Sequence, residues 1–130
     1  GITVSTSGIG TDDHLMMVMI QRLTGARFTI VHFTGAPIQR TNLMGGNVQV
    51  NTMSVGEVMP DPRGLRFIGH GGSAPSRFAP EVPTFKSLGL DFEMYSERGL
   101  VVPVATPDRI LGRLRDAVQE AASDPATIRA

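Results

Sequence analysis

The residues best suited to chemistry gather in one short loop near the start of the chain. Residues 5–11 read Ser-Thr-Ser-Gly-Ile-Gly-Thr, follow a β-branched run at 2–4 and precede an apolar stretch with helical spacing. The first N–H groups of a helix have no intrahelical partner and lie at the positive end of its dipole. Glycine lets a ligand approach the backbone closely. This order of strand, small-residue loop and helix N-terminus predicts a site for a small anionic group.

A nucleotide site is the first alternative for this loop. Gly8 and Gly10 begin a dinucleotide-binding fingerprint, but Asp13 stands where the third glycine is needed. Asp12 adds a second negative charge where a pyrophosphate would bind. No Gly-Lys-Ser/Thr sequence follows, which excludes a Walker loop. A nucleotide- or phosphate-binding α/β enzyme domain, using the helix N-terminus at 8–13, therefore remains only as the alternative function.

The other reactive side chains form no catalytic or metal-binding pattern. His14, His32 and His70 are far apart and lack the spacing of metal ligands. The chain has no Gly-x-Ser-x-Gly elbow for a nucleophilic serine. Neighbouring helical residues point about 100° apart, so Asp12 and Asp13 are poor acid–base partners and suit a helix N-terminus better. We expect no catalytic residue, no metal site and no cofactor.

The composition narrows the class of partner. The 130 residues carry 12 basic and 12 acidic side chains, and only 5% of them are aromatic, with no tryptophan. Nucleic-acid binding normally requires a basic face or aromatic stacking platforms, so no nucleic-acid partner is expected. Cysteine is absent, which removes disulfides and thiolate chemistry. The length and the 41% hydrophobic content suit one globular domain.

The apolar spacing predicts two long helices. The first covers residues 11–24, with Thr11 as its N-cap and Gly25 as its stop signal. The second begins after an N-cap at Thr106 and ends before Pro125. The expected inward faces are Leu15, Met16, Met19, Ile20 and Leu23 in the first helix, and Ile110, Leu111, Leu114, Val118 and Ala121 in the second.

Short apolar runs alternate with turns between the two long helices. This alternation is typical of an α/β fold with a mostly parallel sheet flanked by helices. Loops 5–11 and 33–37 both follow strands, so they are expected at the carboxyl edge of the sheet, where ligands bind. Strands are expected at 28–31, 48–50, 65–68, 92–96 and 100–102, and short helices before Gly45 with Leu43 and Met44 inward, after Ser54, and over 84–88 before Gly89.

Several stretches of the sequence are specific when they occur in this order. They are TSGIGTDDHL at 6–15, TNLMGGNVQV at 41–50, PEVPTF at 80–85 and SERGLVVPVATP at 96–107. With these stretches the chain resembles, over nearly its whole length, the extracytoplasmic solute receptors of tripartite tricarboxylate transporters, also called Bug-type receptors.

The resemblance implies a lobe of a type II periplasmic binding protein. Such receptors have two α/β lobes that clamp the ligand between them. Residues 1–97 correspond to the second, ligand-binding lobe, and residues 98–130 to a segment and helix that cross back to pack on the first lobe. The first lobe is then expected to lie outside this chain, which leaves the helix at 106–124 open to self-association.

The resemblance also implies a function and a site. The protein is expected to be a non-enzymatic periplasmic receptor that closes around a small organic carboxylate and delivers it to the membrane permease subunits of the transporter. Hydroxyls and backbone N–H groups would hold the carboxylate, partly through ordered water. The ligand-binding residues implied are Ser5, Thr6, Ser7, Gly8, Gly10 and Thr11 in the first loop, Phe33, Thr34 and Gly35 in the second, and Ser54 and Val55 in the third.

Overall fold

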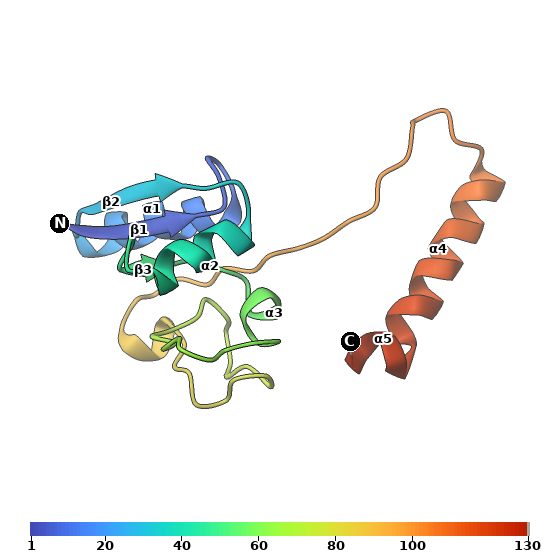
Figure 1. Cartoon of the computed structure of the whole chain (residues 1–130). Coiled ribbons are helices and arrows are strands. Elements are labelled where there is room, and N and C mark those ends of the chain that lie inside the picture. Colours follow the sequence, from blue (N-terminus) through green and yellow to red (C-terminus); the bar gives the residue numbers. More distant parts are fainter. Residues whose placement is uncertain (130) are drawn as a thin grey trace. The chain divides into compact units, whose positions relative to one another are not determined.

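A three-stranded parallel sheet organises the first part of the chain. The computed structural model describes residues 1–129. Strand β1 (Ile2–Thr6) lies between β2 (Phe28–His32) and β3 (Val50–Asn51), and both pairings are parallel. The central position of β1 buries Val4 completely, opposite Val50. The predicted parallel α/β arrangement is therefore confirmed (Figure 1).

Helix α1 (Asp12–Thr24) has the predicted ends. The Thr11 hydroxyl accepts a hydrogen bond from the His14 N–H, and Gly25, with φ 71°, closes the helix through its N–H to the Gln21 carbonyl oxygen. Its buried face differs from the predicted one, because Met17 and Asp13 are the buried side chains. Residues 15–20 are all apolar, so spacing alone does not determine which face meets the sheet. The five residues predicted to face inward are half-buried or exposed instead; they are Leu15, Met16, Met19, Ile20 and Leu23.

Helix α2 (Ala36–Met44) follows β2. It ends at Gly45, as predicted, but it begins at Ala36, inside the predicted loop 33–37, because proline is tolerated in the first turn of a helix. The expected inward position of Met44 was wrong, since its side chain is exposed, while Leu43 is half-buried. The buried side chain of α2 is the polar Gln39. Figure 1 shows α1 behind the sheet and α2 in front of it, so the helices cover opposite faces.

Two short helical segments follow β3. Helix α3 (Val55–Val58) has Ser54 as its N-cap. The Glu57 carboxylate accepts hydrogen bonds from the Ser54 N–H and hydroxyl in a capping box. The 3₁₀ helix η1 (Lys86–Leu88) ends at Gly89. Both segments confirm the predicted turns, because their start and stop signals are local.

The predicted strands at 65–68 and 92–96 were wrong. The chain there is irregular, and an isolated bridge joins His70 to Thr84. Ala79, Val82 and Phe85 are buried in this region, and Phe92 stacks on Phe85 with 5.2 Å between ring centroids. Pro62, Gly64 and Gly69 flank the run at 65–68 and interrupt regular strand pairing there. The stretch at 92–96 makes a backbone hydrogen bond from the Met94 N–H to the Gly71 carbonyl oxygen at 2.8 Å without forming a strand.

The chain divides into two units, Gly1–Glu97 and a second that begins at Arg98. The strand predicted at 100–102 was wrong, because this stretch is extended but unpaired and Leu100 and Val101 are exposed. Helix α4 (Asp108–Ser123) uses Pro107 as its N-cap, one residue later than the predicted cap at Thr106. Helix α5 (Pro125–Arg129) follows it.

Helix α4 carries its apolar stripe without burying it. Ile110, Leu114 and Val118 repeat at helical spacing, and each remains exposed, while Leu111 is half-buried. In the described part of the chain, no helix combines the length and apolar character needed to cross a membrane.

Candidate functional site

The three loops singled out in the sequence lie at one edge of the sheet. They follow the carboxyl ends of β1, β2 and β3, which are parallel neighbours. The Phe33 N–H donates to the Thr6 carbonyl oxygen at 2.9 Å, and the Thr52 N–H donates to the Ser5 carbonyl oxygen at 3.2 Å. These bonds continue the pairing past the strand ends, so the structure brings loops 7–11, 33–35 and 52–55 together.

The hydroxyls at the end of β1 point into the protein. Ser5 and Thr6 are completely buried. The Ser5 hydroxyl donates to Asn51 Oδ1, and Thr6 Oγ1 lies 2.7 Å from His32 Nδ1. Thr6 Oγ1 also lies 3.4 Å from the Gly8 carbonyl oxygen. Both hydroxyls therefore join β1 to its neighbouring strands.

Internal hydrogen bonds hold the loop itself in one conformation. The Thr11 hydroxyl donates to the Gly8 carbonyl oxygen at 2.8 Å, and the Gly10 N–H donates to His14 Nδ1 at 2.9 Å. The His14 and His32 rings meet edge to face, with 4.7 Å between their centroids. Gly10 has φ 78°, a value that L side chains rarely adopt, so glycine is needed at this turn.

One N–H group of the loop already donates a hydrogen bond to a carboxylate of the protein. Asp13 is buried, and its Oδ2 accepts a hydrogen bond from the Ser7 N–H at 3.2 Å. Burial raises the pKa of Asp13, against the lowering effect of hydrogen bonds from the Ser7 hydroxyl and N–H. The nearby charges of Asp12 and Glu57 raise it further. The base of the loop is therefore a negatively charged environment.

Three backbone donors of the loop have no acceptor. Within the described residues, the N–H groups of Gly8, Ile9 and Thr11 make no hydrogen bond. Ile9 is 80% exposed, so a ligand can reach its backbone. Unpartnered N–H groups in a glycine loop before a helix are suited to an anionic oxygen.

A buried amide network supports this edge from the α2 side. Gln39 is 0% exposed, and its Nε2 donates to Asn51 Oδ1 at 2.9 Å and to the Thr52 carbonyl oxygen at 3.0 Å. The Thr52 hydroxyl in turn donates to the Ser5 carbonyl oxygen at 3.0 Å. Gln39 Oε1 and Asn51 Nδ2 are buried without a protein partner. This network ties α2, β3 and β1 together beneath the loops.

The other two loops present less polar surface. Thr34 is exposed, Phe33 is half-buried, and Gly35 is the residue before α2. The Ser54 hydroxyl donates to Glu57 Oε2 at 2.9 Å, and Val55 is half-buried. Across the described residues, no group of three or more His, Asp or Glu side chains is close enough to hold a metal ion.

A groove of about 470 Å³ lies beside these loops, between α2 and α3. Residue types and spacing do not indicate this groove, because its residues come from two short helices and the turns around them. The charged residues of the groove are Arg40 and Glu57. It is lined by Ala36, Pro37, Arg40, Met53, Gly56, Glu57 and Pro60.

Comparison with known proteins identifies the family of this chain. The family model described as the tripartite tricarboxylate transporter family receptor matches residues 1–130. The chain belongs to this receptor family. The curated relatives include a UPF0065 protein from the gbd 5′ region of Cupriavidus necator, 30% identical over 129 residues. Another is a UPF0065 protein from the ttuE–ttuC′ intergenic region of Agrobacterium vitis, 27% identical over 130 residues.

A solved structure shares the fold. It is the ligand-free crystal structure of a TctC solute binding protein from Polaromonas, with a TM-score of 0.72 and 26% identity. The match covers 98% of this chain and 45% of that protein. The matches to the two curated relatives cover 95% and 98% of this chain but only 38% of each relative's own length. The chain thus spans less than half the length of these relatives.

Proposed function

We propose that this chain is the ligand-binding lobe of a solute receptor that holds a small organic carboxylate. One observation carries the proposal: three strand-end loops meet at the carboxyl edge of the sheet, and the N–H groups of Gly8 and Ile9 have no acceptor among the described residues. A carboxylate oxygen is an acceptor that two such donors can bind. Membership of the receptor family supports the same reading.

Backbone groups, rather than hydroxyls, make the main contacts in this proposal. A hydroxyl has one proton to donate. The Ser5 hydroxyl donates its proton to Asn51 Oδ1, and the Thr11 hydroxyl donates its proton to the Gly8 carbonyl oxygen. Ser5, Thr6 and Thr11 then position the loop. Ser7 and Gly10 help to shape it, because their N–H groups donate to Asp13 and His14, and Gly8 and Ile9 present their N–H groups to the ligand. In the other loops, Phe33, Thr34, Gly35, Ser54 and Val55 form the rest of the wall.

The charges around the loop favour a small carboxylate over a nucleotide. Asp13 takes the Ser7 N–H, and the charges of Asp12 and Glu57 act on Asp13. A pyrophosphate would bring two or more negative charges against these carboxylates, whereas a carboxylate group brings one. The nucleotide-binding enzyme alternative is weaker for this reason.

The division of the chain at Glu97 supports a receptor of two lobes. In this proposal residues 1–97 bind the ligand and residues 98–130 cross to another lobe of the receptor. The receptor works in the periplasm, closes around its ligand and passes it to the membrane permease subunits. The exposed apolar stripe of α4 is then a packing surface.

The experiment removes one backbone donor. Ile9→Pro deletes the N–H of residue 9, and Ile9→Ala is the matched control that keeps it. Hydrogen bonds to charged groups contribute about 1.5–3 kcal/mol, so Ile9→Pro should weaken carboxylate binding about tenfold or more in calorimetry. Ile9→Ala should stay within about twofold. Equal affinities of the two variants, both folded by circular dichroism, would place the ligand away from this loop.

A further inference from the structure

The loop of the proposed site is held by a side chain that can change its charge. Thr11 is the N-cap of α1, and His14 is the third residue of that helix. In a capping box this third position carries Glu or Gln, whose side chain accepts a backbone N–H at the start of the helix. Here His14 Nδ1 accepts the Gly10 N–H at 2.9 Å. An imidazole thus takes the place that a carboxylate or amide oxygen usually has.

This hydrogen bond requires one protonation form of the ring. A ring nitrogen accepts an N–H only when it carries no proton itself. His14 Nδ1 is therefore unprotonated, and the neutral ring carries its proton on Nε2. Protonation of Nδ1 would turn the acceptor into a second donor that repels the Gly10 N–H. Histidine is the side chain that makes such a change between pH 5 and 8.

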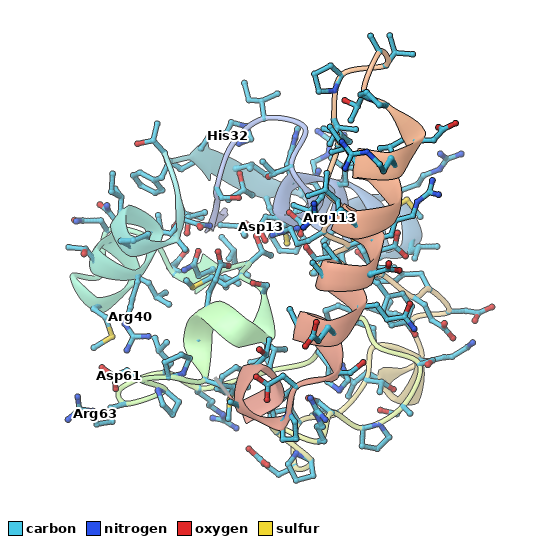
Figure 2. All side chains as sticks on the ribbon, turned by 90° about the vertical axis from the view of Figure 1, so that its right-hand side faces the viewer. Asp13, His32, Arg40, Asp61, Arg63 and Arg113 are labelled. Carbon is cyan, nitrogen blue, oxygen red and sulfur yellow. The ribbon has the colours of Figure 1, made fainter. Side chains whose placement is uncertain are left out.

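Charged and titratable groups surround the His14 ring from three elements. Asp12 and Asp13 are its neighbours on α1, and the His32 ring at the end of β2 meets it edge to face. Glu57 of α3 acts on the charge of Asp13. Figure 2 shows Asp13 and His32 near the loop. The carboxyl groups stabilise an imidazolium, whereas the positive end of the helix dipole and a protonated His32 oppose it.

The His14 hydrogen bond fixes one of the two peptide planes around Ile9. The Gly10 N–H that it accepts belongs to the peptide between Ile9 and Gly10. The neighbouring peptide contains the Gly8 carbonyl oxygen and the free Ile9 N–H, and the Thr11 hydroxyl holds that carbonyl oxygen at 2.8 Å. Glycine on both sides of Ile9 allows many backbone conformations. Loss of the His14 bond would therefore let the loop turn its free N–H groups away from a ligand.

We propose that His14 is a positioning residue of the carboxylate site, which holds the loop in its binding conformation when the ring is neutral and releases the loop when the ring is protonated. This inference rests on the proposed function and adds pH control to the same site. Carboxylate binding then weakens as the pH falls and His14 gains its second proton.

The test is calorimetry on the purified protein between pH 8 and pH 5.5. The probes are pyruvate, fumarate and benzoate, which stay ionised over this range. The wild type should lose about three- to tenfold in affinity for the probe that it binds best, the scale of one lost hydrogen bond. His14→Asn places Oδ1 near the position of Nδ1 and does not titrate, so its affinity should change less than twofold with pH.

Two further variants control for the size of the ring and for the second histidine. His14→Leu offers no acceptor, so it should bind as weakly at pH 8 as the wild type does at pH 5.5. His32→Asn removes the other imidazole at the loop and should keep the pH dependence of the wild type. A readout without ligand is the Gly10 amide resonance of nitrogen-15-labelled protein, which should shift together with the His14 ring resonances during an acid titration.

The outcomes separate this inference from the function on which it rests. If the affinity of the wild type rises toward acid, or if the wild type and His14→Asn have the same pH profile, His14 does not position the loop through its neutral form and the proposed function stands. A Gly10 amide resonance that stays unchanged while the ring titrates overturns the inference as well. If the wild type binds none of the three probes at any pH, the proposed function and the inference fail together.

Discussion

Replacing Gln39 should loosen the carboxyl edge of the sheet. Its Nε2 donates two buried hydrogen bonds, to Asn51 Oδ1 and to the Thr52 carbonyl oxygen. Each bond contributes about 0.5–1.5 kcal/mol net, so their loss costs roughly 1–3 kcal/mol. Gln39 Oε1 has no partner, and its removal offsets part of that cost. We expect Gln39→Met, which fills a similar volume, to lower the free energy of unfolding by about 1–2 kcal/mol.

Gln39→Glu is the matched variant with almost the same shape. The ionised carboxylate cannot donate, and it places an uncompensated charge in a completely buried position. Breaking a buried charge pair costs about 3–5 kcal/mol, and a buried charge with no counter-ion should cost at least the lower value. Burial raises the pKa of the introduced carboxyl group, so its penalty is absent below its unfolded pKa and grows as the pH rises through the folded pKa.

Urea unfolding at pH 7 and pH 4, followed by circular dichroism, measures both variants. The expected order of stability at pH 7 is wild type, Gln39→Met and then Gln39→Glu, with unchanged slopes against urea concentration. The gap between Gln39→Glu and the wild type should narrow at pH 4. Equal stabilities of the two variants at pH 7, or a Gln39→Met protein as stable as the wild type, would refute the buried network.

Two further predictions concern the loop and the C-terminal helix. Asp13→Asn should raise the free energy of unfolding at pH 7, because burial raises the pKa of Asp13 and the wild type loses stability as the pH rises through that pKa. In urea unfolding the difference between variant and wild type should fade below pH 4. A variant less stable than the wild type at pH 7 would contradict this prediction. The exposed stripe of α4 should cause association, so light scattering across concentration should give a smaller mass for Leu114→Glu than for the wild type; a wild type that is monomeric at every concentration would contradict this.

Local signals predicted the ends of elements well. Thr11 and Gly25 bound α1, and Ser54 with Glu57 starts α3, because a cap needs only residues within one turn. The parallel sheet and the meeting of loops 5–11 and 33–37 also followed from the alternation of elements, whereas the third loop, with Ser54 and Val55, was implied only by the family resemblance. These features depend on chain order and on neighbours in sequence, which a single sequence contains.

Features that depend on distant contacts were not predictable in the same way. The strand predicted at 65–68 did not form, because an apolar run between prolines and glycines packs equally well as irregular chain. Gln39 gave no signal, since a buried amide is recognised only when its partners Asn51 and Thr52 are known. Arg40 likewise stands out only through its position in the groove and its weak pairing with Asp61.

The most direct test of the proposed receptor function is a calorimetric titration of the purified wild-type protein with carboxylates, ATP and NAD under identical conditions. The loop at 7–11 has backbone donors for a carboxylate and three carboxylates at or near its base, Asp12, Asp13 and Glu57. We therefore predict saturable binding of at least one small organic carboxylate without added metal, and no binding of ATP or NAD. Micromolar binding of ATP or NAD, with no binding of any carboxylate, would contradict the receptor function.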